Sequence, residues 1–159
     1  MPLQILINLS LAFLWMFMSS EFSFISFLNG YLLGLATVFI MRRFLPGSFY
    51  IRRVWAIIKL SFTFLWELSK SNIDVARIVL KPKIDIHPGF YAYPCDLEEE
   101  WEVSLLTALV TLTPGTVVVA ISDDHSTIYI HGLHLQSAEA EINRVKTRFE
   151  YLIKEVSRA

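Results

Sequence analysis

Residues 22–41, FSFISFLNGYLLGLATVFIM, decide the fold class, because this stretch holds twenty residues without one charged side chain. At about 1.5 Å of rise per helical residue, it matches a hydrocarbon core about 30 Å thick and predicts a membrane-spanning helix. Arg42 and Arg43 close the stretch, and Arg52 and Arg53 follow it. Because an excess of Lys and Arg marks the cytoplasmic end of a span, we expect the chain to leave this helix on the cytoplasmic side.

Two glycines, Gly30 and Gly34, lie four residues apart and therefore on one face of the predicted helix. Without side chains they allow the backbone of another helix to approach closely, so their spacing predicts a helix-packing contact. Glycine is also common in membrane helices in general, and the spacing alone leaves this simpler explanation open.

Residues 3–18 form a second apolar stretch, interrupted only by Gln4, Asn8 and Ser10. A signal peptide is the alternative to a short span, but no basic segment precedes the stretch and no small-residue cleavage site follows it. A tight turn at residues 19–21 joins the two stretches, so we expect an antiparallel transmembrane hairpin over residues 1–43. Glu21 then lies at the outer interface as a solvated side chain.

The composition agrees with a membrane protein that carries a soluble part. The 159 residues are 54% hydrophobic with a mean hydropathy of +0.49, which is too apolar for an ordinary soluble domain. Residues 1–83 hold nine basic and three acidic side chains, whereas residues 84–159 hold five and twelve. A basic membrane half suits anionic lipid, and an acidic half suits a solvated domain or a basic partner surface. No feature indicates nucleic-acid binding, and the single cysteine, Cys95, leaves no internal disulfide.

Residues 44–83 predict a loop at Pro46 and Gly47 and then a long amphipathic helix in the membrane interface. Its polar side chains recur every three or four residues, at Lys59, Thr63, Glu67, Lys70, Asp74, Arg77 and Lys81. We expect Glu67 to pair with Lys70, and Asp74 with Arg77. The alternative is a third span through residues 55–68, which would place Lys59 and Glu67 in the bilayer at a large cost in free energy.

Residues 84–159 predict a small cytoplasmic α+β domain. An aromatic run at 84–94 reads as an edge strand, and Asp96 with Glu99 reads as a capping box for a helix ending near Leu112. Residues 117–121 and 127–131 predict a hairpin, and Ser137 caps a final helix. That helix carries an apolar stripe of Ala138, Ile142, Val145, Phe149, Leu152 and Val156. The order β-α-β-β-α is the ferredoxin-like arrangement without its last strand.

Residues 103–121 also lack charge and could be mistaken for a span. Thr113, Pro114, Gly115 and Thr116 interrupt them with a turn signal, and the β-branched residues that follow favour a strand. The stretch therefore predicts a helix, a turn and a strand.

No catalytic, cofactor or metal site is predicted. His131 and His134 are three residues apart, a spacing that places strand residues on opposite faces, so they are weak candidates for a zinc site. The acids at 98–102 begin a helix and point in different directions, and Asp123 and Asp124 read as turn formers. There is no phosphate-binding glycine loop, activated nucleophile or carboxylate pair.

Residues 112–133, LTPGTVVVAISDDHSTIYIHGL, and residues 27–35, FLNGYLLGL, resemble the E subunit of the Mrp-type multisubunit Na⁺/H⁺ antiporters of bacteria. The resemblance extends over the whole chain. It implies an accessory subunit in the cell membrane, in a complex that exchanges cytoplasmic Na⁺ or Li⁺ for external protons, with the ion path in the large subunits. The matching residues carry over as structural marks only: Thr113, Pro114, Gly115, Thr116, Asp123, Asp124, Tyr129 and His131.

Two functions follow as hypotheses. The first is an assembly subunit whose hairpin packs into a larger helix bundle through Gly30 and Gly34, with the other antiporter subunits and the lipid bilayer as partners and a contact between two copies also compatible. The second is a stand-alone membrane-tethered module that senses a ligand or binds a soluble protein. An independent transporter is disfavoured, because two spans are too few to enclose a pathway.

Overall fold

The computed structural model describes residues 2–45, 49–82, 86–135 and 137–158. The chain forms two compact units, residues 1–54 and residues 55–158. The predicted loop residues Pro46 and Gly47 and the predicted strand start at Ile84 lie outside the described residues.

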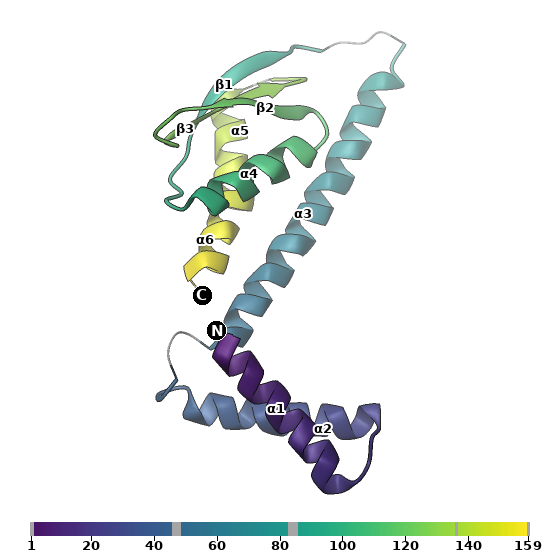
Figure 1. Ribbon diagram of the computed structural model, residues 1–159. Helices are drawn as coiled ribbons and strands as arrows, with labels where there is room; N and C mark the ends of the chain where they lie inside the picture. Colours follow the sequence, from purple (N-terminus) through teal and green to yellow (C-terminus); the bar gives the residue numbers. More distant parts are fainter. Residues whose placement is uncertain (1, 46–48, 83–85, 136, 159) are drawn as a thin grey trace. The chain divides into compact units, whose positions relative to one another are not determined.

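The first unit is a hairpin of two apolar helices, α1 (Pro2–Ser19) and α2 (Phe24–Met41), drawn in purple and blue in Figure 1. Both are long and apolar enough to cross a membrane, and they are the two such helices in the described part of the chain. Ser23 begins α2, because its hydroxyl accepts a hydrogen bond from the backbone N–H of Ser26. Most side chains of both helices are exposed, so the hairpin turns wide apolar faces outward.

Helix α3 (Tyr50–Val79) is thirty residues long. From Trp55 onward it belongs to the second unit, where Ala56 and Leu60 are buried in the core of the α+β domain. It does not meet the length and apolarity expected of a span, which agrees with its prediction as an amphipathic helix.

The sheet of the second unit has three antiparallel strands in the order β1–β3–β2, namely β1 (Gly89–Pro94), β3 (Thr127–Gly132) and β2 (Thr116–Ile121). Both outer strands run antiparallel to β3, so β1 and β2 are parallel to each other and α4 (Glu100–Leu112) connects them. The edge position predicted for β1 is confirmed. A bulge at Val119 interrupts the pairing of β2.

The start of α4 differs from the prediction. The expected capping box of Asp96 and Glu99 is wrong, because the helix begins at Glu100 and Glu99 is its cap. The carboxylate of Glu102 accepts hydrogen bonds from the backbone N–H groups of Glu98 and Glu99. Buried Leu97 holds the preceding segment against the core, and Asp96 binds Lys146 at 2.8 Å. Burial of Leu97 thus moves the helix start beyond the local capping signal.

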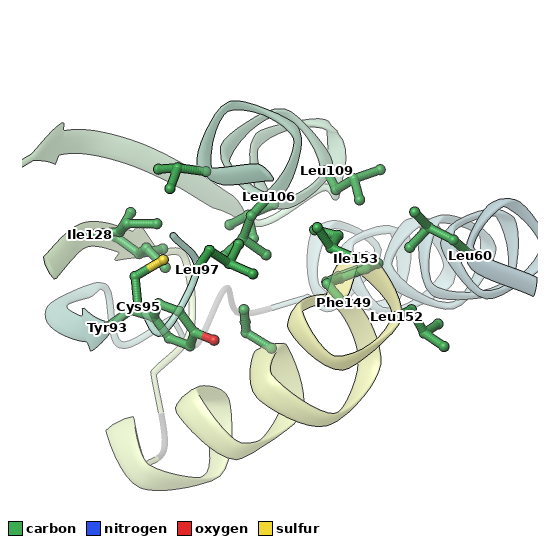
Figure 2. Close-up of a cluster of buried hydrophobic side chains, with 14 of the residues drawn as sticks. Leu60, Tyr93, Cys95, Leu97, Leu106, Leu109, Ile128, Phe149, Leu152 and Ile153 are labelled. Carbon is green, nitrogen blue, oxygen red and sulfur yellow. The ribbon is translucent and has the colours of Figure 1, made fainter. Parts of the chain in front are cut away.

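The final helix is α5 (Ala138–Val145), one π-helical turn η1 (Lys146–Glu150), and α6 (Tyr151–Arg158). Ser137 caps it as predicted, by accepting a hydrogen bond from the backbone N–H of Ala140. The predicted stripe faces the core, with four members buried and two packed at its edge: Val145, Phe149, Leu152, Val156, Ala138 and Ile142. Figure 2 shows Phe149, Leu152 and Ile153 between Leu60 of α3 and the core residues of α4.

Two apolar helices followed by further helices and a three-stranded antiparallel sheet agree with the predicted fold class at that level. The helix, turn and strand predicted for residues 103–121 are also present, as α4, residues 113–115 and β2.

Candidate functional site

Both predicted packing glycines are buried within the hairpin, against α1 of the same chain. A Cβ atom added at Gly30 would lie 2.8 Å from the backbone oxygen of Ala12 and 2.8 Å from the Cβ of Trp15. A Cβ atom at Gly34 would overlap the amide oxygen of Asn8. The glycine face is therefore filled by α1, and a further helix would have to bind the hairpin elsewhere.

A buried group of polar side chains, which we call the polar clasp, ties α1, α2 and the start of α3 together inside the first unit. It consists of Gln4, Asn8, Tyr31 and Tyr50. The Asn8 amide donates to the Tyr50 hydroxyl at 2.6 Å, and that hydroxyl lies 2.9 Å from the Tyr31 hydroxyl. The backbone N–H of Tyr50 donates to the side-chain oxygen of Gln4 at 3.0 Å.

The polar clasp was missed by sequence reasoning, although a signal existed. Gln4 and Asn8 are the first two polar residues of an apolar stretch and are one helical turn apart, so they share a face. Polar side chains in membrane helices tend to face protein and to find partners there. The partner Tyr50 lies 42 residues after Asn8, and no local pattern points to it.

Helix α3 places its charged residues in three different settings. Lys59 binds Glu155 of α6 at 2.9 Å, and Asp74 binds Arg77 at 3.4 Å as predicted. The predicted pair of Glu67 with Lys70 is wrong, because Glu67 is only 3% exposed and binds Arg148 of η1 at 3.1 Å. Glu67 faces the α+β domain, whereas Lys70 is exposed on another side of the helix.

The opposite side of α3 carries large apolar side chains that remain exposed. They are Trp55, Ile58, Phe62, Leu65, Trp66 and Ile73, and we call them the outer face of α3. Their spacing of three or four residues makes one continuous stripe along the helix. A stripe of this kind on a soluble surface marks a site of contact with a protein or a membrane.

The motif residues at 113–116 serve the backbone of the turn between α4 and β2. The Thr113 hydroxyl donates to the carbonyl of Leu109, and the Thr116 hydroxyl donates to that of Val110, both at 2.8 Å. These bonds satisfy carbonyls at the end of a helix. Gly115 has φ +93°, a conformation that L side chains rarely adopt, while Pro114 cannot continue the helix.

The hairpin between β2 and β3 is organised by Asp124. Its carboxylate accepts hydrogen bonds from the hydroxyls of Ser122 and Ser126 and from the backbone N–H of Ser126. These bonds lower the pKa of Asp124 to about 2. Asp123 is exposed beside it, as expected of a turn residue. Tyr129 and His131 lie on β3, where the His131 ring contacts Phe90 at a centroid distance of 4.6 Å.

A second buried polar group, also missed from the sequence, surrounds Glu150. The Tyr93 hydroxyl donates to this carboxylate at 2.5 Å, and Lys154 binds its other oxygen at 2.8 Å. Burial and the bond to Glu150 raise the pKa of Tyr93 far above its usual value. The π-helical turn η1 ends at Glu150, where both Phe149 and Glu150 are buried.

In the described part of the chain, no three His, Cys, Asp or Glu side chains are grouped so that they could hold a metal ion. The backbone N–H of His87 donates to the Nδ1 atom of His134 at 3.3 Å, and Cys95 is buried in the core. The polar groups described so far pack the protein rather than perform chemistry. They define a small membrane-anchored protein with an α+β domain.

Comparison with known proteins identifies the family. Residues 8–156 match the family model described as "Na⁺/H⁺ ion antiporter subunit". The E1 subunit of the Na⁺/H⁺ antiporter of Staphylococcus saprophyticus is 48% identical over 156 residues, which cover 98% of each chain. The corresponding Na⁺/H⁺ antiporter protein of Bacillus subtilis, also an E subunit, is 45% identical over 158 residues, covering 99% of this chain and all of that one. The chain therefore belongs to the family of Na⁺/H⁺ antiporter E subunits, and the resemblance found in the sequence is confirmed.

A solved structure shares the fold. One chain of the membrane-bound sulfane sulfur reductase, an archaeal respiratory membrane complex, superposes with a TM-score of 0.57. The match covers 96% of this chain and 98% of that one at 23% sequence identity. At this identity the likeness concerns the fold alone.

Proposed function

We propose that the chain is an accessory subunit that supports assembly of a multisubunit Na⁺(Li⁺)/H⁺ antiporter and does not itself carry the ion path. One observation carries the proposal: α1 and α2 contain no Asp, Glu, Lys, Arg or His. A proton or Na⁺ route across a bilayer needs such side chains, and this hairpin supplies none. Its exposed apolar faces instead suit contact with lipid and with helices of other antiporter subunits.

Transport measured per assembled complex tests this proposal. Asn8→Leu removes the amide of the polar clasp, and Ala36→Val, on the exposed side of α2, is the matched control. With the full set of subunits co-expressed, we expect Asn8→Leu to lower the yield of purified complex while Na⁺-driven proton flux per complex stays unchanged. Loss of flux at an unchanged yield would place this chain in the ion path and overturn the proposal.

Co-purification separates this function from the stand-alone regulatory module. A tagged chain taken from membranes in mild detergent should bring large antiporter subunits with it in a fixed ratio. Recovery of the chain by itself, in a detergent that keeps other membrane complexes intact, would favour the regulatory module.

We further propose that the α+β domain lies on the cytoplasmic side of a cell membrane crossed twice by the hairpin. The four arginines at 42, 43, 52 and 53 support this orientation. Native Cys95 is unsuited to a labelling test, because it is buried and burial raises the pKa of its thiol. Asp123→Cys in a Cys95→Ala background offers an exposed thiol instead. An impermeant maleimide should label it in inverted vesicles, and labelling in intact cells would contradict the orientation.

The outer face of α3 completes the proposal as an interfacial surface. Trp55 and Trp66 are about 65% and 60% exposed, and indole rings favour the boundary between lipid and water. Lys70 and Arg77 lie along the same helix and suit anionic headgroups. We also propose that the domain is a ferredoxin-like unit without its last strand, which the strand order β1–β3–β2 supports.

A further inference from the structure

The second unit contains a cavity of about 360 Å³ that no part of the subunit role explains. Its walls come from the second half of α3, the turn at 113–116, residues 132–135 and the first turns of α5. The volume is far above that of one water, about 30 Å³, and falls in the range of small-molecule sites. The cavity therefore has room for an organic molecule.

Tyr91 contributes a polar group to this cavity that the fold leaves unused. The residue is 5% exposed, and its hydroxyl is buried without a hydrogen-bond partner among the described residues. Buried hydroxyls are normally paired, so an unpaired one at a cavity wall needs an explanation. Burial and the nearby Glu141 carboxylate raise the pKa of Tyr91 to about 12, so the hydroxyl stays protonated and can donate.

The charges around the cavity favour a cation. Glu141 lines it with one carboxylate oxygen buried, held by Arg144 at 2.9 Å. Asp74 lines the α3 side and is about half exposed. Arg77 also touches Asp74, but it is not part of the wall and is largely in solvent, where such pairs are weak. The lining side chains thus carry two carboxylates against one guanidinium, with the buried hydroxyl of Ser71 and His134 beside them.

We propose that this cavity binds a small organic ammonium compound that also carries a hydrogen-bond acceptor. The ammonium group lies toward the carboxylates of Asp74 and Glu141, and the acceptor receives the hydroxyl proton of Tyr91. The site depends on Pro114 and Gly115, which form the wall between α4 and β2. It gives the motif turn a role beyond folding. The inference goes beyond the subunit role and does not rest on it.

Ethanolamine is the probe, because it combines an ammonium group with a hydroxyl that can accept. Saturation-transfer NMR on the full chain in lipid nanodiscs should detect its binding, while acetate, which has the opposite charge, should give no signal. Asp74→Asn and Tyr91→Phe should each weaken the ethanolamine signal at least threefold. Asp123→Asn, which removes an equal charge from the distant β2–β3 hairpin, should leave it unchanged.

A blocking variant keeps the test independent of those substitutions. Ala140 lines the cavity from the exposed side of α5, so Ala140→Trp should fill the space and abolish the signal. Circular dichroism confirms that each variant keeps its thermal transition. The proposal is overturned if the native chain gives no ethanolamine signal, if acetate binds instead, or if folded Ala140→Trp binds ethanolamine as the native chain does.

Discussion

Adding one methyl group at Gly34 should loosen the membrane hairpin, and the cause should be the amide of Asn8. The new Cβ atom would overlap the Asn8 amide oxygen and lie 3.0 Å from the Asn8 backbone oxygen. The amide must then rotate, which breaks its bond to the Tyr50 hydroxyl. Gly34→Ala therefore disrupts the polar clasp without touching Tyr50.

The expected magnitude follows from three opposing effects. A side-chain hydrogen bond between membrane helices contributes about 0.6 kcal/mol on average and at most about 1.7. The remaining overpacking against backbone costs about 1–3 kcal/mol. The higher helix propensity of alanine returns up to about 1 kcal/mol. The free energy of unfolding of the hairpin should fall by about 1–2 kcal/mol.

A double-mutant cycle separates the amide from the backbone. In an Asn8→Ala background the overlapping atom is gone, so Gly34→Ala should lose much of its penalty, with a coupling of about 0.5–1 kcal/mol. Gly30→Ala should not be rescued by Asn8→Ala, because its Cβ meets the backbone of Ala12 and the Cβ of Trp15.

The assay is reversible unfolding in mixed micelles titrated with SDS, followed by energy transfer between probes at the ends of α1 and α2. Ala36→Val, on the exposed side of α2, is the control and should change the free energy by less than about 0.5 kcal/mol. If the full Gly34→Ala penalty persists without the Asn8 amide, our account of this contact is refuted.

Two further predictions concern the second unit. Arg148→Met should destabilise it by about 2–4 kcal/mol, because it leaves the buried Glu67 carboxylate uncompensated, whereas Lys70→Met should cost less than about 0.5 kcal/mol; denaturant unfolding measured by near-UV circular dichroism checks both, and equal effects would contradict the pairing. Asp124 has a folded pKa of about 2, below its unfolded value of about 3.9, so its stabilisation is present above pH 4 and lost as the pH falls toward 2; Asp124→Ala should flatten this part of the melting profile, and an unchanged profile would rule the carboxylate out as its source.

Several parts of this protein follow from local sequence. The charge-free stretch at 22–41 is helical and apolar in any fold that can contain it, because its length and hydropathy leave few alternatives. Pro114 and Gly115 end α4 through backbone geometry alone. The final helix follows its three- and four-residue apolar spacing, including through η1. In each case the determining information lies within one or two turns of the chain.

The partners of buried polar groups do not follow in this way. Glu67 has Lys70 on its own helix at a favourable spacing, yet it binds Arg148, because the packing of α3 on the domain buries the glutamate and leaves the lysine outside. Tyr93 likewise meets Glu150, 57 residues later. A buried polar atom must find a partner wherever the fold provides one, whereas an exposed atom can bind water.

The sequence by itself thus determined the membrane hairpin, the broken apolar stretch at 103–121, the secondary-structure order of the domain and the family. Only the tertiary structure decided that α1 fills the glycine face, that Gln4 and Asn8 hold Tyr50, and that Tyr91 lines a cavity with an unpaired hydroxyl. The physical reason is range. Helix periodicity and backbone restriction act between near neighbours in the chain, whereas close packing and hydrogen-bond pairing act between whichever atoms folding brings together.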